Sequence, residues 1–169
     1  GAGCFDLIVQ NEQVETLAQR LTELGAAWVG KRAQNILRIE AGMPRYGVDF
    51  SEDNLLLEVG LDNAYSYTKG CYLGQEVVER IRSRGHVNRK LCGLLLDGKL
   101  PADAGNAIVA GDNEVGKITS SVVSFALNRP IALGYIHKDF CAPGTKLSVR
   151  RDGSAIDATV NALPFVAPR

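Results

Sequence analysis

The sequence predicts an α+β protein in which a mixed module, residues 1–88, precedes a small antiparallel β-barrel, residues 89–169. Three observations support this class. Apolar residues recur at helical spacing in three stretches of the first module. Beyond residue 89, short β-type runs alternate with turn residues, a pattern typical of a small closed barrel or sandwich. With 169 residues, 46% of them hydrophobic, the chain can also bury the core of one large domain or two small ones.

The first module is expected to begin with a strand and two helices. Residues 5–9 read FDLIV, which favours a strand, and Asn11 is a candidate N-cap for the next helix. Apolar residues then recur every three or four positions over 14–24, and Gly25 ends this helix. Residues 31–40 have the spacing of a second helix.

A third helix is predicted over residues 74–84. Leu73, Val77 and Ile81 are spaced by four, and Gly85 stops the pattern. The barrel follows with five expected strands, separated by turns rich in glycine, aspartate and proline. These strands are residues 91–96, 114–121, 131–137, 146–151 and 155–160, and residues 151–154 predict a two-residue hairpin between the last two.

Composition and charge exclude several classes of function. Nineteen Lys and Arg balance nineteen Asp and Glu, so no overall field attracts nucleic acid or an anionic membrane. No stretch approaches the roughly 20 apolar residues of a membrane helix, and no secretory signal opens the sequence, which favours a cytoplasmic protein. The four cysteines are far apart without a CxxC pair, which indicates reduced thiols and argues against a structural metal site.

Cys71 is the candidate reactive residue. Residues 69–76 read KGCYLGQE, so the thiol lies on a sharply turning backbone just before a helix, where backbone N–H groups carry partial positive charge. This position and the neighbouring Lys69 favour the thiolate, the form that attacks carbon or binds metal. The alternative is a small buried hydrophobic residue. That alternative is preferred for Cys4, Cys92 and Cys141, which lack such a context.

A cluster of cations after the motif can be interpreted in a functional or a structural way, and so can Glu40. Cations follow the motif, at Arg80, Arg82, Arg84, Arg89 and Lys90, with His86 among them. They form either a solvated face or a site for carboxylates or phosphates.

Glu40 ends the second helix and is followed by a tight loop, residues 41–47. Its carboxylate is expected to be solvated or paired with Arg38 or Arg45. If it is enclosed, it could instead accept hydrogen bonds from an amino-pyrimidine.

Three stretches carry a resemblance to a known family. KGCYLGQE followed by Arg80 resembles the signature of the YgfZ-like folate-binding proteins. Residues 37–49, LRIEAGMPRYGVD, are similar to a segment of the whole glycine-cleavage T-protein superfamily. Residues 115–120 with 131–135, and the final 163–165, are similar to the barrel of these proteins. The resemblance covers nearly the whole chain but begins in the middle of a typical member, so roughly 40% of such a protein would precede it.

The resemblance implies the second half of a T-protein-like fold and a tetrahydrofolate-type cofactor. By this resemblance the ligand contacts are Glu40, Tyr46, Lys69, Gln75 and Arg80, with chemistry at Cys71 assisted by Lys69. The thiol-bearing branch implies an accessory factor for assembly or repair of iron-sulfur enzymes, with client or assembly proteins as partners. The alternative is a tetrahydrofolate-dependent one-carbon transferase. RNA binding is disfavoured because aromatic residues are not interleaved with the cations, and the sequence does not indicate an oligomeric state.

Overall fold

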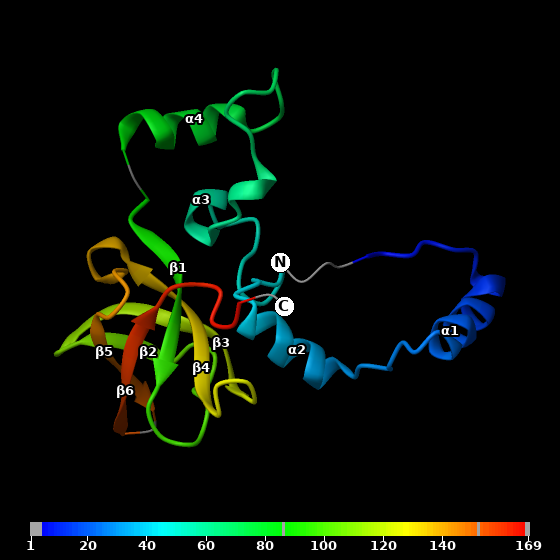
Figure 1. The fold of residues 1–169 in the computed structure, drawn as a ribbon. Coiled ribbons are helices and arrows are strands. Elements are labelled where there is room, and N and C mark those ends of the chain that lie inside the picture. Colours follow the sequence, from blue (N-terminus) through cyan, green and yellow to red (C-terminus); the bar gives the residue numbers. More distant parts are fainter. Residues whose placement is uncertain (1–4, 86, 152, 168–169) are drawn as a thin grey trace.

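The computed structural model describes residues 5–85, 87–151 and 153–167. Six antiparallel strands close a barrel in the second half of the chain (Figure 1). They are β1 (Arg89–Leu96), β2 (Ala107–Ala110), β3 (Asn113–Ser124), β4 (Arg129–His137), β5 (Lys146–Arg151) and β6 (Ser154–Asn161). Around the barrel the order is β1-β4-β3-β2-β5-β6, and β6 pairs back with β1. The predicted α+β class with a C-terminal barrel is confirmed.

Side chains along β4 point alternately into and out of the barrel, and a hydrophobic core lies on each side of its wall. Ala132 and Ile136 belong to the interior core, which also receives Leu94 from β1. Leu133 and Tyr135, one position out of phase, face outward and join a second core. The helices pack on the outer core. Any site between a helix and the barrel is therefore lined by the outward-facing residues of β1 and β4.

Four α-helices precede the barrel. They are α1 (Val14–Glu23), α2 (Lys31–Glu40), α3 (Leu56–Val59) and α4 (Gln75–Arg84), with short 3-10 turns at Asn11–Gln13, Asp62–Ala64 and, within the barrel, Lys138–Phe140. α2 packs on β3 and β4 through the buried Ile39, and α3 packs on β1 through Val59. In Figure 1, α4 lies beyond α3, away from α2. No helix in the described ranges is long and apolar enough to cross a membrane.

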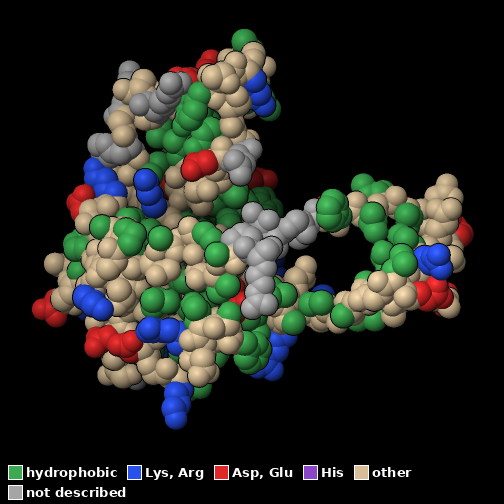
Figure 2. Space-filling view, in the orientation of Figure 1, with side chains coloured by type: hydrophobic (Ala, Val, Ile, Leu, Met, Phe, Trp, Pro, Cys, Tyr) green, Lys and Arg blue, Asp and Glu red, His purple; other side chains and the backbone are tan. Residues whose placement is uncertain are grey.

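The first segment and α1 extend from the rest of the molecule as an arm, residues 5–30 (Figure 1). Large apolar side chains are open to solvent along it, as the green atoms of the arm in Figure 2 show. Phe5 is 89% exposed and Ile8 96%. An apolar groove within the arm is lined by residues that include Leu17 and Trp28.

The end of the chain seals the junction between α2 and the barrel. The backbone N–H groups of Phe165 and Val166 donate to the carbonyl oxygen of Glu40 at 2.9 and 3.0 Å. The same segment packs so closely on β1 that a Cβ at Gly93 would lie 2.7 Å from the Phe165 ring and 2.8 Å from Leu163. Gly93 is therefore fixed by packing rather than by its backbone angles.

Several sequence expectations need correction. Residues 5–9 form no strand, because the structure gives this exposed segment no strand partner among the described residues. Asn11 does not cap α1: it begins a 3-10 turn, and Gln13 is the residue before the helix. The short elements α3 and β2 were not expected, so the barrel has six strands instead of five. The bounds of α2 agree with the prediction, those of α4 differ by one residue, and Arg151 pairs with Ser154 as the predicted hairpin requires.

Candidate functional site

Three carboxylates are buried between the helices and the outer wall of the barrel. Glu40, Asp49 and Glu58 are 7%, 2% and 8% exposed. Burying a carboxylate is costly unless hydrogen bonds or cations compensate for lost hydration. The partners of each carboxylate therefore distinguish a structural role from a ligand-binding one.

Glu40 is enclosed by the barrel and has partners there. Its Oε1 accepts a 2.6 Å hydrogen bond from the Ser124 hydroxyl and a 3.2 Å bond from the backbone N–H of Ala126. The Ser124 oxygen in turn accepts from the N–H of Leu127 at 3.0 Å. Since these groups lie at the end of β3 and in the turn after it, Glu40 joins α2 to the barrel. Glu40 is therefore not solvated, at 7% exposed, and it pairs with neither Arg38 nor Arg45 among the described residues; Arg38 pairs with Asp49 instead.

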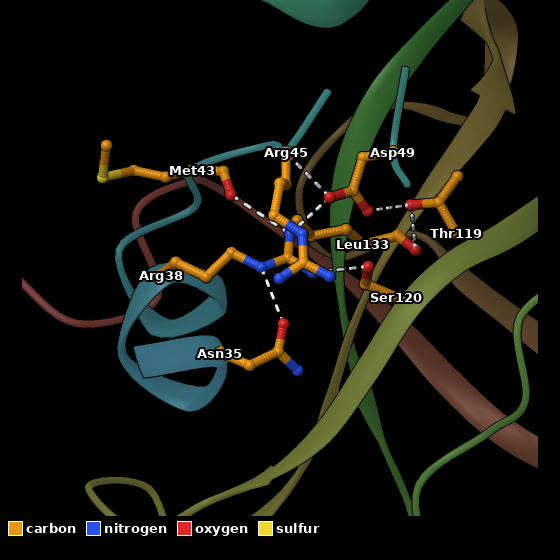
Figure 3. Close-up of polar contacts among 8 residues, drawn as sticks. All are labelled: Asn35, Arg38, Met43, Arg45, Asp49, Thr119, Ser120 and Leu133. Atoms are coloured by element: carbon orange, nitrogen blue, oxygen red, sulfur yellow. Dashed lines mark hydrogen bonds and ion pairs between the residues drawn. The ribbon is translucent and has the colours of Figure 1, made fainter. Parts of the chain in front are cut away.

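Asp49 and Arg38 form the centre of a polar cluster that ties the loop after α2 to β3 (Figure 3). Asp49 accepts from Arg38 Nη1, from the Arg45 backbone N–H at 2.9 Å and from the Thr119 hydroxyl at 2.6 Å. Arg38 also donates from Nη2 to Ser120 Oγ at 2.8 Å. Both side chains have several partners, which is typical of a structural ion pair.

Glu58 differs from the other two carboxylates. Its Oε1 lies 3.2 Å from Arg89 Nε, but its Oε2 is buried without a hydrogen-bond partner among the described residues. The Tyr135 hydroxyl is likewise buried and unpartnered. Arg89 links the two, because its guanidinium also lies 5.1 Å from the centroid of the Tyr135 ring. A buried acceptor and a buried donor without protein partners are rare and favour a site for a polar ligand.

The environment keeps the Tyr135 hydroxyl protonated. Burial, followed by the negative charge of Glu58, raises the pKa of Tyr135 to about 12, although Arg89 opposes the shift. At neutral pH the phenol can therefore donate a hydrogen bond beside the acceptor Glu58 Oε2. We define the candidate site as Glu58, Arg89 and Tyr135, where α3 meets β1 and β4.

The predicted Cys71 loop lies outside this site. Cys71 is exposed, and the Nζ atom of Lys69 lies 4.5 Å from the centre of the Tyr72 ring. Gln75 Oε1 accepts a 3.2 Å hydrogen bond from the Tyr72 backbone N–H. Gly74 has a φ of +88°, a left-handed conformation that glycine adopts readily, and it precedes α4. The loop is thus a sharply turned helix start, as predicted.

The structure does not gather the predicted site residues into one place. In Figure 1, α4 and the loop before it lie on the far side of α3 from α2, whose last residue is Glu40. The Tyr46 hydroxyl is directed to Glu52 at 3.3 Å, and its ring packs edge-on against Phe50. Arg80 is exposed on α4. His86 and Cys4 lie outside the described residues, as do the side chains of Arg82 and Arg84.

Comparisons with known proteins give the family. Residues 89–167 match the model of the glycine cleavage T-protein C-terminal barrel domain. The chain is 34% identical to the aminomethyltransferase of Thermosynechococcus vestitus and 36% identical to that of Streptomyces coelicolor, over 98% of the chain in each case. The chain belongs to the glycine-cleavage T-protein superfamily. It spans about half the length of these relatives, 45% and 46% respectively.

A solved structure supports the same assignment for the fold. The aminomethyltransferase T of the glycine cleavage system from Bartonella henselae superposes with a TM-score of 0.84 at 28% identity. The match covers 94% of this chain and 45% of that protein. The helical module and the barrel of this T-protein superfamily member are therefore arranged as in an aminomethyltransferase.

Sequence reasoning missed two of the three residues in the candidate site. Arg89 was singled out among the cations, but Glu58 and Tyr135 were not singled out as site residues. Glu58 lies in the four-residue helix α3, too short to show a periodic pattern, and its burial depends on docking against β1. No group of three or more metal-ligating side chains occurs in the part of this superfamily member that the structure describes.

Proposed function

We propose that this chain is the C-terminal part of a tetrahydrofolate-binding protein and that Glu58 and Tyr135 contact the ligand. The proposal rests on two buried polar atoms at one place that have no hydrogen-bond partner among the described residues, Glu58 Oε2 and the Tyr135 hydroxyl. A reduced pterin has an amino-pyrimidine edge with adjacent N–H donors and a carbonyl acceptor. Such an edge can donate to Glu58 and accept from Tyr135, which satisfies both atoms.

In this proposal Glu58 takes the role that the sequence assigned to Glu40. Glu40 already receives two hydrogen bonds from the barrel, whereas Glu58 retains a free acceptor. Arg89 holds the Glu58 carboxylate in place and supplies positive charge beside it. Tyr46, Lys69, Gln75 and Arg80 remain proposed contacts for other parts of the ligand, with the rest of the site supplied by protein that the relatives have beyond this chain.

The reaction best supported is one-carbon transfer of the kind named for the relatives, which are aminomethyltransferases. Bound tetrahydrofolate would supply the chemistry as carrier of the one-carbon unit. The residues of this chain would bind and orient it: Glu58 and Tyr135 by hydrogen bonds, and the outer core by excluding water.

Calorimetry with tetrahydrofolate on the full-length protein tests the binding site. Glu58→Gln removes the charged acceptor, and we expect affinity to fall about 10-fold to 150-fold, the equivalent of about 1.5 to 3 kcal/mol for a hydrogen bond to a charged group. Glu114→Gln, an exposed change on β3, is the matched control and should bind like the wild type. If Glu58→Gln bound normally while Glu40→Gln bound weakly, the ligand would have to be placed at Glu40 instead.

A second function is favoured by the exposed thiol of Cys71. A cysteine close to Lys69 in the loop before α4 can act as a soft ligand or a nucleophile, and its exposure leaves it open to a partner. On this basis we propose, as the second candidate, an accessory factor for iron-sulfur enzymes whose clients or assembly proteins meet Cys71.

Complementation separates the two candidates. Full-length wild type and Cys71→Ser would be expressed in cells that lack the native protein, with an iron-sulfur dehydratase and glycine cleavage measured separately. Loss of the dehydratase activity alone in Cys71→Ser would support the accessory factor. Glycine cleavage supported by both proteins, with no dependence of the dehydratase on either, would support the transferase.

A further inference from the structure

Two cysteines that lie far apart in the sequence meet at one end of the barrel. Cys92 lies on β1 in the interior core, and Cys141 follows the 3-10 turn after β4 and packs against the same core. Cys92 Sγ approaches the carbonyl oxygen of Lys90 and Cys141 Sγ that of Ile136, and Lys90 and Ile136 are paired neighbours on β1 and β4, so the two thiols lie close together. Cys71, in contrast, belongs to the loop before α4, away from the barrel (Figure 1).

The two thiols have different surroundings. Cys92 is only 8% exposed, and its Sγ lies 3.6 Å from the carbonyl oxygen of Lys90. Cys141 is half-buried, and its Sγ lies 3.3 and 3.4 Å from the carbonyl oxygens of Ile136 and His137. Small oxidants in solution therefore reach the half-buried Cys141 before the buried Cys92.

The pKa values of the two thiols also make Cys141 the more reactive of the pair. The hydrogen bond with Cys92, helped by Lys90, lowers the pKa of Cys141 to about 7, against the effects of burial and Asp139. The same hydrogen bond and burial raise the pKa of Cys92, which stays a protonated donor. The nearby His137 imidazole is engaged with the Asp139 carboxylate at 3.4 Å. An accessible thiolate backed by a buried thiol is the arrangement of a redox-active pair.

We propose that Cys92 and Cys141 form a reversible dithiol–disulfide couple, with Cys141 as the attacking thiol and Cys92 as the resolving thiol. Cys141 lies in a loop after a single 3-10 turn rather than in a strand, so its sulfur can approach that of Cys92 to bonding distance without breaking a β-ladder. The couple lies at the barrel end where the chain enters from α4, since the N–H of Lys138 donates to the carbonyl of Asn88.

Hydrogen peroxide is the oxidant in the proposed reaction. The Cys141 thiolate attacks one peroxide oxygen, so an S–O bond forms, the O–O bond breaks and hydroxide leaves to become water on protonation. The Cys92 sulfur then attacks the sulfenic sulfur of Cys141. An S–S bond forms, the S–O bond breaks and a second water leaves with the Cys92 proton. The peroxide gains two electrons and the two thiols lose two, and a small dithiol returns the pair to its reduced state.

The test uses the complete chain with Cys4→Ser and Cys71→Ser, which leaves only the two thiols in question. After brief exposure to hydrogen peroxide at pH 7, we expect one intramolecular Cys92–Cys141 disulfide by non-reducing peptide mass spectrometry. Free thiols should disappear together and return with dithiothreitol. Phenylarsine oxide, which bridges adjacent thiols, should bind the reduced chain in a 1:1 ratio and fail to bind the oxidised one.

Single variants in that background establish the order of attack. Cys92→Ser should accumulate a Cys141 sulfenic acid that dimedone traps, whereas Cys141→Ser should leave Cys92 unmodified while the chain stays folded by circular dichroism. In the unmutated chain, peptide mapping should find the same disulfide, which guards against an effect of the substitutions. Disulfides only between molecules, or peroxide oxidation of Cys92 at an equal rate in Cys141→Ser, would overturn the proposal.

Discussion

The hydroxyl of Ser124 donates a 2.6 Å hydrogen bond to the carboxylate of Glu40, across more than half of the described sequence. Ser124 ends β3 and is fully buried, whereas Glu40 ends α2. The carbonyl oxygen of Glu40 also accepts from Phe165 and Val166. One residue thus connects the helical module, the barrel and the final segment of the chain.

Glu40→Ala should therefore destabilise the fold. The change removes the acceptor of the Ala126 N–H and leaves the buried Ser124 hydroxyl without its acceptor, which costs about 1 to 3 kcal/mol. Urea unfolding of Glu40→Ala, Ser124→Ala and the double variant would measure it. The double-mutant cycle should give a coupling of at least about 0.5 kcal/mol. Additive losses would mean that the hydrogen bond contributes nothing.

Asp49→Ala should cost more than Glu40→Ala. The Asp49 side chain is fully buried and that of Arg38 is 12% exposed, so the change leaves a buried cation without its counterion, at about 3 to 5 kcal/mol. Glu23→Ala breaks a matched but exposed pair with Arg20 and should change the free energy of unfolding by less than about 0.5 kcal/mol. Similar losses in the two variants would contradict the structural role assigned to Asp49.

The barrel could be predicted from local signals, but its sixth strand and the order in which its strands pair could not. Turn residues and short apolar runs locate five strands, because glycine and aspartate mark chain reversals within a few residues. β2 was missed because a four-residue strand is too short to show alternation. The strand expected over residues 5–9 does not form for a different reason. Its residues favour a strand, but a strand also needs a neighbouring strand to pair with, and local sequence does not show whether one is present.

The candidate site was predicted even less completely, because burial and pairing are tertiary properties. The sequence marks Cys71 by its flanking glycines and Glu40 by its place before a tight loop. It gives no sign that Glu58 is buried with one free oxygen, or that Cys92 and Cys141 meet. Both follow from the order in which the barrel strands pair, which brings distant residues together.

Tyr135→Phe separates ligand binding from stability. The hydroxyl is buried without a partner in the described residues, so its removal should leave the free energy of unfolding unchanged or slightly higher. If the hydroxyl donates to the ligand, tetrahydrofolate affinity should still fall about 5-fold to 10-fold, the value of a neutral hydrogen bond. Urea unfolding and calorimetry on the full-length protein give both numbers. A large loss of stability would mean that the hydroxyl has a structural partner.

Gly93→Ala tests the packing of the final segment on β1. The added methyl group would lie 2.7 Å from the Phe165 ring and 2.8 Å from Leu163, and relieving that overlap should cost about 1 to 3 kcal/mol. Gly70→Ala, where the added Cβ has no atom within 4 Å, is the control and should cost less than about 0.5 kcal/mol. In a chain truncated before residue 163, Gly93→Ala should have the same free energy of unfolding as the truncated chain that keeps Gly93.

The pH dependence of Cys141 follows from its partner. Because the hydrogen bond with Cys92 is the largest cause of the lowered pKa of Cys141, Cys92→Ala should return that pKa from about 7 toward its ordinary value of 9.0. The thiolate fraction at pH 7 would then fall from about one half to about one hundredth, and the rate of alkylation by iodoacetamide should fall at least about tenfold.

The ionisation of Cys141 also affects the stability of the fold. A pKa lowered in the folded state means that ionisation of Cys141 favours folding. The contribution is complete above pH 9 and is lost as the pH falls through about 7. Alkylation followed by peptide mass spectrometry from pH 5.5 to 9.5 would give the midpoint for Cys141, with the exposed Cys71 as a reference that should react alike in both proteins. If the midpoint for Cys141 were the same with and without Cys92, the hydrogen bond between the thiols would not control its reactivity.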